Sequence, residues 1–401
     1  MVKILSINAG SSSLKWKLFD MPSERQVAEG ATDILRQSTV KIKYGTDRVY
    51  ESTTPIRNYR EAVSNLLSHL QSLGLVNRLD EITGIGHRVV AGGELFSAPI
   101  VIDNRVLAQI RALRDYAPLH NPVEADCIDI FRKMIPWALE VAVFDTAFHQ
   151  TMKPVNYLYS IPYEYYQKYG VRKYGAHGTS VRYVSAHAAK MLGKPLESMR
   201  MIVMHLGAGS SITAIQNGKS VDTSMGFTPV SGVTMGTRAG DVDVSLIAYL
   251  MKKLDITDVD QMIDILNTES GLRGISGISH DVRDLEAAAP THPRAKLALD
   301  IFVNRIIKYI GAYAALMNGV DVLVFTAGIG EHSSNIRARI MQSLGYLGAR
   351  IDPERNLQIH DNAGDITAAD ARVKTLVIPT NEELMIVRDV MSLSQVAQQA
   401  E

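Results

Sequence analysis

Two short runs of small residues have the composition of phosphate-binding turns. An Ala-Gly-Ser-Ser run occupies positions 9–12 and recurs at 208–211, each time after an apolar stretch. Such a run carries a strand into a tight turn, and the backbone N–H groups of a turn can surround the oxygens of an anion. Lys15 lies just beyond the first run, where its ammonium group could neutralise charge on a phosphate. The alternative is a plain hairpin turn followed by solvated lysines.

The spacing of the two runs suggests a duplicated domain. They lie 199 positions apart (208 against 9) in a chain of 401 residues. We expect the two turns to face each other across a cleft and to hold one oligophosphate from both sides. The second run has no lysine at the matching place. The first run is therefore expected to carry the metal and phosphate chemistry, and the second to form a nucleotide cradle.

Three further loops place a cation among small residues. His177 lies between two glycines, Arg238 lies in the glycine-lined segment 235–241, and Arg88 is followed closely by a Gly-Gly pair. Two arginines and a histidine with no nearby excess of acid suit an anion that is being transferred. Any one of these loops could be a plain surface loop, but the three together predict a functional site.

A fourth glycine-rich segment, 328–331, is expected between a buried strand and the start of a helix. Glycines at such a place let a flat ring or a phosphate approach the backbone. The alternative is a packing turn.

The last helix offers a candidate metal ligand at its start. Thr380 and Glu383 fit a capping box, in which the two side chains satisfy backbone N–H groups. That role would leave Glu382 available for a metal. Asn8 and Glu382 would form a sparse oxygen site, which suits Mg²⁺ because that ion keeps most of its waters.

Strands that alternate with helices predict an α/β fold. In the first half we expect two strands within the first 20 residues or so, a helix over 59–76, a helix capped by Asn121 that ends near Met134, and a strand over 141–144. In the second half we expect a hairpin at Asn217-Gly218, a helix around 296–318, a strand over 322–325, a helix after 333–334, and a last helix from Thr380 onward.

Length and composition place the chain among ordinary globular enzymes. Two domains are expected, because 401 residues exceed what one hydrophobic core usually serves. Zero formal net charge gives no reason to expect nucleic acid or an anionic membrane as a partner. Cys127 is the single cysteine, which excludes an internal disulfide and fits a reducing compartment. With no targeting segment and no apolar run of ~20 residues, a cytoplasmic location is expected.

The order of the motifs resembles that of the acetate kinase family, which belongs to the superfamily of sugar kinases, actin and heat-shock chaperones. The resemblance covers essentially the whole chain and rests on Asn8–Lys15, His177–Ser180, Met235–Asp243 and Gly328–Glu331.

This resemblance implies a fold and an activity. The fold would consist of two duplicated actin-like (ribonuclease H-like) α/β domains, residues 1–150 with 384–401 and residues 151–383, with a cleft between them. The activity would be reversible phosphorylation of acetate or another short carboxylate by ATP, giving an acyl phosphate. A homodimer and a requirement for Mg²⁺ or Mn²⁺ are also implied.

The resemblance further implies which residues bind the nucleotide and the metal. Asn8 and Glu382 would hold the metal, and Lys15 would lie near the transferring phosphate. The remaining nucleotide-binding positions would be Ser11, Ser13, His205, Leu206, Gly207, Ala208, Gly209, Asp281, Val282, Arg283, Gly328, Ile329, Gly330, Glu331 and His332.

The implied catalytic residues act mainly through charge. Arg88 and Arg238 would grip carboxylate and phosphoryl oxygens, and His177 and Arg238 would stabilise the transition state. Asp145 is the family's acid/base residue. A carboxylate is already an anionic nucleophile at pH 7, so the problem is repulsion between two anions rather than removal of a proton. We therefore expect Asp145 to orient other groups more than to accept a proton.

The implied acyl pocket, by contrast, departs from the family pattern. It would consist of Val90, Leu119, Ala176 and Pro229, and the family's usual residue at position 176 is phenylalanine. The smaller side chain should widen the pocket unless a neighbour fills the space. A wider pocket predicts weaker selection against propionate or butyrate, since one methylene is worth roughly 1–3 kcal/mol in such pockets.

Three more departures lie in the nucleotide loops. Ala208 and His332 replace a usual asparagine, and Val282 replaces a usual phenylalanine. The alternatives to an acetate kinase are therefore a propionate or butyrate kinase with a widened acyl pocket, and a nucleotide-binding regulatory homologue with little turnover.

Overall fold

The computed structural model describes residues 2–400 except 11, 35–37 and 119, without the side chains of 397–400. Ser11 and Leu119, two of the predicted site residues, therefore lie outside the described residues. Within the described part, no helix is long and apolar enough to cross a lipid bilayer.

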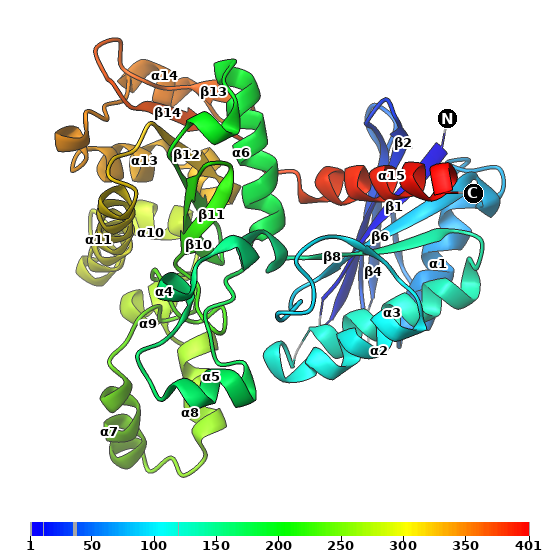
Figure 1. The fold of residues 1–401 in the computed structure, drawn as a ribbon, viewed down its shortest axis with the longest axis horizontal. Helices are drawn as coiled ribbons and strands as arrows, with labels where there is room; N and C mark the ends of the chain where they lie inside the picture. Colours follow the sequence, from blue (N-terminus) through cyan, green and yellow to red (C-terminus); the bar gives the residue numbers. More distant parts are fainter. Residues whose placement is uncertain (1, 11, 35–37, 119, 401) are drawn as a thin grey trace. The chain divides into compact units, whose positions relative to one another are not determined.

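The chain folds into two compact α/β units, each built around one mixed sheet, which confirms the predicted fold class (Figure 1). Unit 1 comprises residues 1–147 and 381–401, and unit 2 comprises residues 148–380. The divisions expected from the sequence, after 150 and after 383, each lie three residues further along the chain.

Unit 1 contains an eight-stranded sheet with helices on both faces. Its strands are β1 (Val2–Ala9), β2 (Ser13–Met21), β3 (Arg25–Asp33), β4 (Thr39–Tyr44), β5 (Arg48–Thr53), β6 (Ile82–Val89), β7 (Ile100–Val101) and β8 (Leu139–Phe144). Its helices are α1 (Tyr59–Ser72), α2 (Asn104–Ala112), α3 (Asn121–Met134) and α15 (Glu382–Ala400). α1 and α3 cover one face of the sheet, and α15 lies on the other (Figure 1).

Unit 2 contains a six-stranded sheet. Its strands are β9 (Met201–Leu206), β10 (Ser210–Gln216), β11 (Lys219–Thr223), β12 (Val322–Thr326), β13 (Gly364–Asp365) and β14 (Lys374–Val377). Its helices are α4 (Pro154–Tyr157), α5 (Tyr163–Tyr169), α6 (Gly178–Leu192), α7 (Val244–Leu254), α8 (Val259–Thr268), α9 (Gly271–Ser276), α10 (Val282–Ala288), α11 (Pro293–Leu316), α12 (Ala327–His332), α13 (Ser334–Met341) and α14 (Pro353–Gln358).

Alternation along β9 distributes its side chains between two hydrophobic cores. Ile202 and Met204 belong to the core that contains α11, whereas Met201 and Val203 belong to the core that contains α6. Because successive side chains of a strand point to opposite faces, His205 lies on the α6 side. The strand thus directs this histidine toward the first turn of α6.

The two sheets share one topology, as expected of a duplicated domain. The order β3-β2-β1-β6-β8 in unit 1 corresponds to β11-β10-β9-β12-β14 in unit 2. In both sheets, the first three strands of this order pair antiparallel. The third, fourth and fifth strands pair in parallel.

The structural repeat is offset from the repeat in the sequence by two residues. β1 ends at Ala9 and β9 at Leu206, and β2 begins at Ser13 and β10 at Ser210, so equivalent positions lie 197 apart (206 against 9, 210 against 13). The Ala-Gly-Ser-Ser strings, 199 apart, are therefore not structurally equivalent. Gly10 corresponds to Gly207, and the shared letters overstate the similarity of the two turns.

Most of the predicted elements are confirmed, including the hairpin β10–β11, the buried strand β12 and the helix α11. Segment 328–331 lies between the buried strand β12 and the start of α13, as predicted, although it is itself part of the short helix α12, which follows β12 without a loop. The next helix, α13, is capped by Ser333, whose hydroxyl accepts a bond from the N–H of Ile336.

Candidate active site

In unit 1, helix α15 lies against two glycines of β6. A Cβ atom at Gly84 or Gly86 would collide with side chains of α15, Val390 and Ile386. Alternation along the strand puts Arg88 on the same face, one step beyond Gly86. Glu382 precedes Ile386 by four residues, about one helical turn, so it lies above Arg88.

Arg88 is held by two residues from neighbouring strands. Its Nε and Nη2 donate to the Asp145 carboxylate, with Nη2 2.5 Å from Oδ2, and its Nη1 lies 3.2 Å from Oδ1 of Asn8. The Asp145 side chain is 2% exposed, and the Arg88 side chain is 21% exposed. Although burial alone would lower the pKa of Arg88, the charges of Asp145 and Glu382 outweigh it and raise that pKa.

These bonds leave part of the guanidinium available for a ligand. They use one N–H on each nitrogen, and each terminal nitrogen carries a second N–H. Two parallel N–H groups of this kind match the two oxygens of a carboxylate. Arg88 can therefore bind an anion while Asp145 fixes its orientation.

The loop that follows Arg88 is held by the first turn of α3. The N–H of Val90 donates to Oε2 of Glu124 at 3.1 Å, and the N–H of Ala91 donates to Oδ1 of Asn121 at 3.1 Å. Asn121 also donates to the carbonyl of Ala91. The prediction that Asn121 caps α3 is wrong, because its side chain holds this loop instead. Val90 packs with Ala91 and Ala117.

Glu124 is a carboxyl group in an unfavourable place for a negative charge. It is 2% exposed, and burial raises its pKa to about 8, although Arg88 lowers it. Its Oε1 has no hydrogen-bond partner among the described residues. A protonated carboxyl group is therefore the expected form of Glu124 near neutral pH.

The start of α15 is capped differently from the prediction. Oδ1 of Asn381 accepts the N–H of Leu384 at 3.0 Å, so Asn381 is the cap. Glu383 pairs with Lys17 at 3.2 Å. Thr380 belongs to unit 2, where its N–H donates to Glu331 and its hydroxyl bonds Ser180. The capping box of Thr380 and Glu383 is not formed.

Glu382 and Asn8 both lie next to Arg88. Burial, and after it the charge of Asp145, raises the pKa of Glu382 to about 7. A cation nearby would favour the ionised carboxylate. Among the described residues, no three His, Cys, Asp or Glu side chains group as metal ligands. The oxygens of Asn8 and Glu382 do fit Mg²⁺, which needs only one or two protein ligands besides phosphates and water.

Lys15 lies beside this group on the sheet. It is directly opposite Asn8 in the β1–β2 pair, so both side chains are on one face. Lys15 is exposed, whereas Ser13 is half-buried at the turn, where its carbonyl accepts the N–H of Gly10.

In unit 2, His177 immediately precedes α6. Its Nδ1 lies 2.9 Å from the hydroxyl of Ser211, and its ring stacks on His205 with centroids 4.0 Å apart. Nδ1 of His205 in turn lies 2.8 Å from the hydroxyl of Ser180. Nε2 of His177 lies near Gly209, where an added Cβ atom would be 3.4 Å from it.

Arg238 meets His177 at the same glycine. An added Cβ atom at Gly209 would lie 3.2 Å from Nη1 of Arg238. Burial lowers the pKa of Arg238. The loop carrying Arg238 is joined to the β9–β10 turn by a bond from the N–H of Gly236 to the carbonyl of Ala208 at 3.1 Å. The predicted pair thus converges on the second small-residue turn.

Three of the predicted nucleotide loops surround one cavity of about 430 Å³. Its lining residues are Gly207, Ala208, His280, Asp281, Val282, Arg283, Glu286, Gly328, Ile329, His332 and Ser333. Asp281 caps α10 and pairs with Arg283, which lowers the pKa of Asp281 to about 2.

Five predicted nucleotide residues of unit 2 do not line this cavity, among them His205 and Gly209, which are described above. Leu206 is buried in the α11 core, Gly330 is buried in α12, and Glu331 binds the N–H of Thr380. Sequence reasoning missed His280, Glu286 and Ser333 as lining residues. It also missed Ser211 as the partner of His177, although Ser211 belongs to the repeated Ala-Gly-Ser-Ser run.

The predicted acyl-pocket residues are divided between the units. Val90 is in unit 1, and Ala176 and half-buried Pro229 are in unit 2. Ala176 is 5% exposed and packs with Met225 and Met235, which are 1% and 0% exposed. The two methionines therefore occupy space around the small side chain.

Comparison with known proteins identifies relatives that match nearly the whole chain. The sequence model of the Acetokinase family matches residues 3–388. An acetate kinase of Lacticaseibacillus paracasei is 70% identical over 98% of this chain and 100% of its own length. An acetate kinase of Latilactobacillus sakei is 56% identical over 98% of this chain and 100% of its own length.

Two solved structures are also similar over nearly the whole chain. The acetate kinase of Porphyromonas gingivalis has a TM-score of 0.94 at 40% identity and covers 98% of this chain and 99% of its own. A propionate kinase from Francisella tularensis has a TM-score of 0.91 at 40% identity and covers 98% of this chain and 100% of its own. The chain belongs to the acetokinase family.

Proposed function

We propose that this protein transfers the γ-phosphoryl group of ATP directly to the carboxylate of acetate, giving ADP and acetyl phosphate, and that the reaction is reversible. The observation that carries the proposal is the convergence of His177 and Arg238 on Gly209, in a turn whose residues Gly207 and Ala208 line the 430 Å³ cavity. A nucleotide in this cavity would direct its phosphates toward two groups that stabilise negative charge.

The residues of unit 1 bind and orient the acceptor in this proposal. Arg88 receives the acid through its remaining N–H groups, and Asp145 keeps the guanidinium in one orientation. Asp145 has no proton to remove, because the acceptor is ionised at neutral pH. Lys15 contributes positive charge on the same face of the sheet.

The residues of unit 2 stabilise the transferring group. His177 donates through Nε2 while Ser211 fixes its other nitrogen, and Arg238 supplies the second set of donors. Donors fixed before the reaction stabilise developing charge more effectively than mobile water does. Asn8 and Glu382 would hold Mg²⁺, which would neutralise and align the phosphate oxygens when bound.

A propionate or butyrate kinase is the second candidate. Ala176 in place of a phenylalanine favours it, and the similar propionate kinase of F. tularensis shows that one fold serves both acids. Met225 and Met235 argue against a wider pocket, because they fill space around Ala176. We therefore place acetate first.

We further propose that a second copy of the chain covers α7 and its neighbours. α7 is apolar, yet none of its residues is buried, and Val244 is 80% exposed. Exposed apolar residues also occur on α8 and α5, including Val259 and Tyr163. An apolar face of this extent is typical of an interface. Light scattering should report a homodimer, and Val244→Glu should yield monomers.

A cytoplasmic location, suggested by the single cysteine, is part of the same proposal.

Trapping the acyl phosphate tests the proposed activity. The protein is incubated with Mg·ATP, hydroxylamine and acetate, propionate or butyrate, and the hydroxamate is measured. Hydroxamate with acetate supports the proposal, and a higher kcat/KM with a longer acid supports the second candidate. ATP binding without hydroxamate from any acid would favour a regulatory homologue.

A further inference from the structure

The backbone leading to His177 has an unusual conformation. φ is +76° at Gly175 and +61° at His177. The left-handed region is unfavourable for a residue with a side chain, so surrounding contacts must maintain this value at His177. The conformation also decides where the imidazole points, since His177 is the residue before the first turn of α6.

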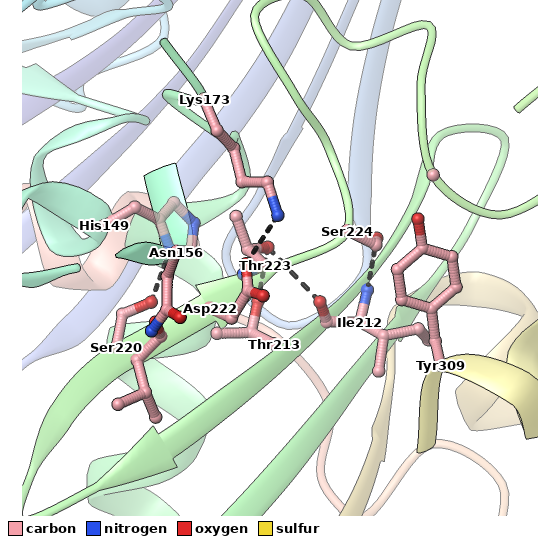
Figure 2. A network of polar contacts seen from close by, with 12 residues as sticks. His149, Asn156, Lys173, Ile212, Thr213, Ser220, Asp222, Thr223, Ser224 and Tyr309 are labelled. Carbon is pink, nitrogen blue, oxygen red and sulfur yellow. Dashed lines mark hydrogen bonds and ion pairs between the residues drawn. The ribbon is translucent and has the colours of Figure 1, made fainter. Parts of the chain in front are cut away.

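A buried histidine supplies such a contact. Nε2 of His149 lies 2.9 Å from the carbonyl oxygen of Ala176, the residue immediately before His177. A carbonyl only accepts, so this nitrogen carries the proton. Nδ1 of His149 then accepts from the hydroxyl of Ser220, 2.9 Å away (Figure 2). The two bonds fix both the tautomer and the orientation of the ring.

The ring of His149 also contacts the peptide itself. An added Cβ atom at Gly175 would lie 2.8 Å from Cδ2 of His149, so the ring packs directly on this glycine. His149 is 0% exposed, and burial lowers its pKa to about 4. It therefore stays neutral, with the same donor and acceptor, across the range in which the protein would work.

Ser220 is itself held in place. It lies on β11 and is fully buried, and its carbonyl accepts a bond from the hydroxyl of Thr151 at 2.8 Å. Nearby, Thr213 and Thr223 share a separate hydroxyl bond of 2.9 Å (Figure 2). The hairpin β10–β11 thus supports His149 through Ser220, and the methyl group of Thr223 packs against Gly175 from the same hairpin.

We propose that His149 is a positioning residue for His177. Its bond to the carbonyl of Ala176 maintains the left-handed conformation that directs Nε2 of His177 toward Gly209, while Ser211 fixes the other nitrogen. The proposal rests on the role of His177 in phosphoryl transfer given above. The hydrogen bonds of the His149 ring go to Ala176 and Ser220, and His149 is not among the residues that line the cavity.

Paired variants test this proposal by separating kcat from KM. His149→Leu removes the donor, and His149→Gln keeps an N–H at a similar reach. We expect His149→Leu to lower kcat about 10- to 100-fold, because misplacement by about 1 Å can cost 100-fold. KM for ATP should change less than about 2-fold. His149→Gln should stay within about 5-fold of the wild-type kcat, and the control Thr213→Val within about 2-fold.

Several results would overturn the proposal. A folded His149→Leu protein with wild-type kcat would do so, and so would a His149→Gln protein as impaired as His149→Leu. If His149→Leu does not fold, Ser220→Ala replaces it, with an expected loss of about 3- to 10-fold in kcat; an unchanged kcat contradicts the proposal.

A second measurement does not depend on turnover. Imidazole ¹⁵N spectra should show the His177 signals displaced in Ser220→Ala and unchanged in Thr213→Val. Unchanged signals in Ser220→Ala would contradict the positioning role. If the wild type makes no hydroxamate, the proposed function fails, and these spectra alone decide the role of His149.

Discussion

Ile386 of α15 occupies the space that the missing side chain of Gly86 leaves on β6. This contact sets the height of α15 above the sheet, and one turn earlier the helix presents Glu382 to Arg88. The position of a candidate metal ligand therefore depends on a glycine in a neighbouring strand.

Gly86→Ala should push α15 away from the sheet. The added methyl group meets Ile386 and Val390 in a packed interface, where overpacking costs about 1–3 kcal/mol. We expect a lower free energy of unfolding, measured in urea, and a higher Mg²⁺ concentration for half-maximal activity. Gly345→Ala is the control, since nothing lies within 4 Å of its Cβ position. Equal stability of the two variants would contradict the packing argument.

Glu124→Gln should stabilise the protein at alkaline pH. The pKa of Glu124 is about 8 in the folded chain against a reference of 4.5, so between these values the unfolded chain loses a proton that the folded chain keeps. Stability therefore falls as pH rises from about 4.5 to about 8. Glutamine resembles the neutral acid and can still accept the N–H of Val90. The variant should match the wild type near pH 4.5 and exceed it by at least about 1 kcal/mol at pH 8.

Urea unfolding at several pH values between 5 and 8.5 measures this difference. A difference that stays constant with pH would mean that Glu124 is ionised in the folded protein. In that case Arg88 stabilises its charge more than burial and the charge of Asp145 oppose it.

Asp145→Asn separates an orienting group from a base. Asparagine keeps one acceptor for Arg88 but loses the charge, so the guanidinium is held less firmly. We expect KM for acetate to rise about 10-fold, with kcat within about 10-fold of wild type. Steady-state kinetics on protein of unchanged thermal stability provide the measurement. Complete loss of kcat with normal substrate binding would identify Asp145 as a proton acceptor instead.

Ala176→Phe tests whether the acyl pocket is wide. The phenyl ring must displace Met225 and Met235, so the variant should lose about 1–3 kcal/mol of stability. If the pocket is wide in the wild type, the variant should favour acetate over propionate about 10-fold more strongly. The ratio of kcat/KM for the two acids measures this. An unchanged ratio would mean that the methionines already fill the pocket.

Local patterns in the sequence predicted those parts of the site that depend on short segments. Small-residue turns after apolar runs predicted the two loops, and glycines around His177 and Arg238 marked these residues as candidates for the site. Each of the three segments that line the cavity was also recognisable from its sequence. Two of them meet because β9 and β12 are parallel and end at the same edge of the sheet of unit 2, whereas the segment at the start of α10 reaches the cavity through tertiary packing.

Side chains that serve distant backbone groups were not predictable in this way. Asn121 and Thr380 have the residue types of helix caps, yet both bond to other segments, and Asn381 caps α15 instead. A capping pattern states what a side chain can do locally, whereas tertiary contacts decide what it does. His149 has no local signature, since only the fold brings Ala176 to it. The repeat in the sequence is displaced by two residues from the repeat in the structure. Identical residues occur at positions that are not equivalent in the strands.

The turnover of Arg238→Ala tests the central claim most directly, namely that fixed charge on the Gly209 turn stabilises the transferring phosphoryl group. Hydroxamate formation from acetate and Mg·ATP is measured at saturating substrate, together with the Kd for ATP on the same protein. The account predicts a loss of about 10²- to 10³-fold in kcat with the Kd within about 3-fold of wild type. A kcat within about 3-fold of wild type would contradict it.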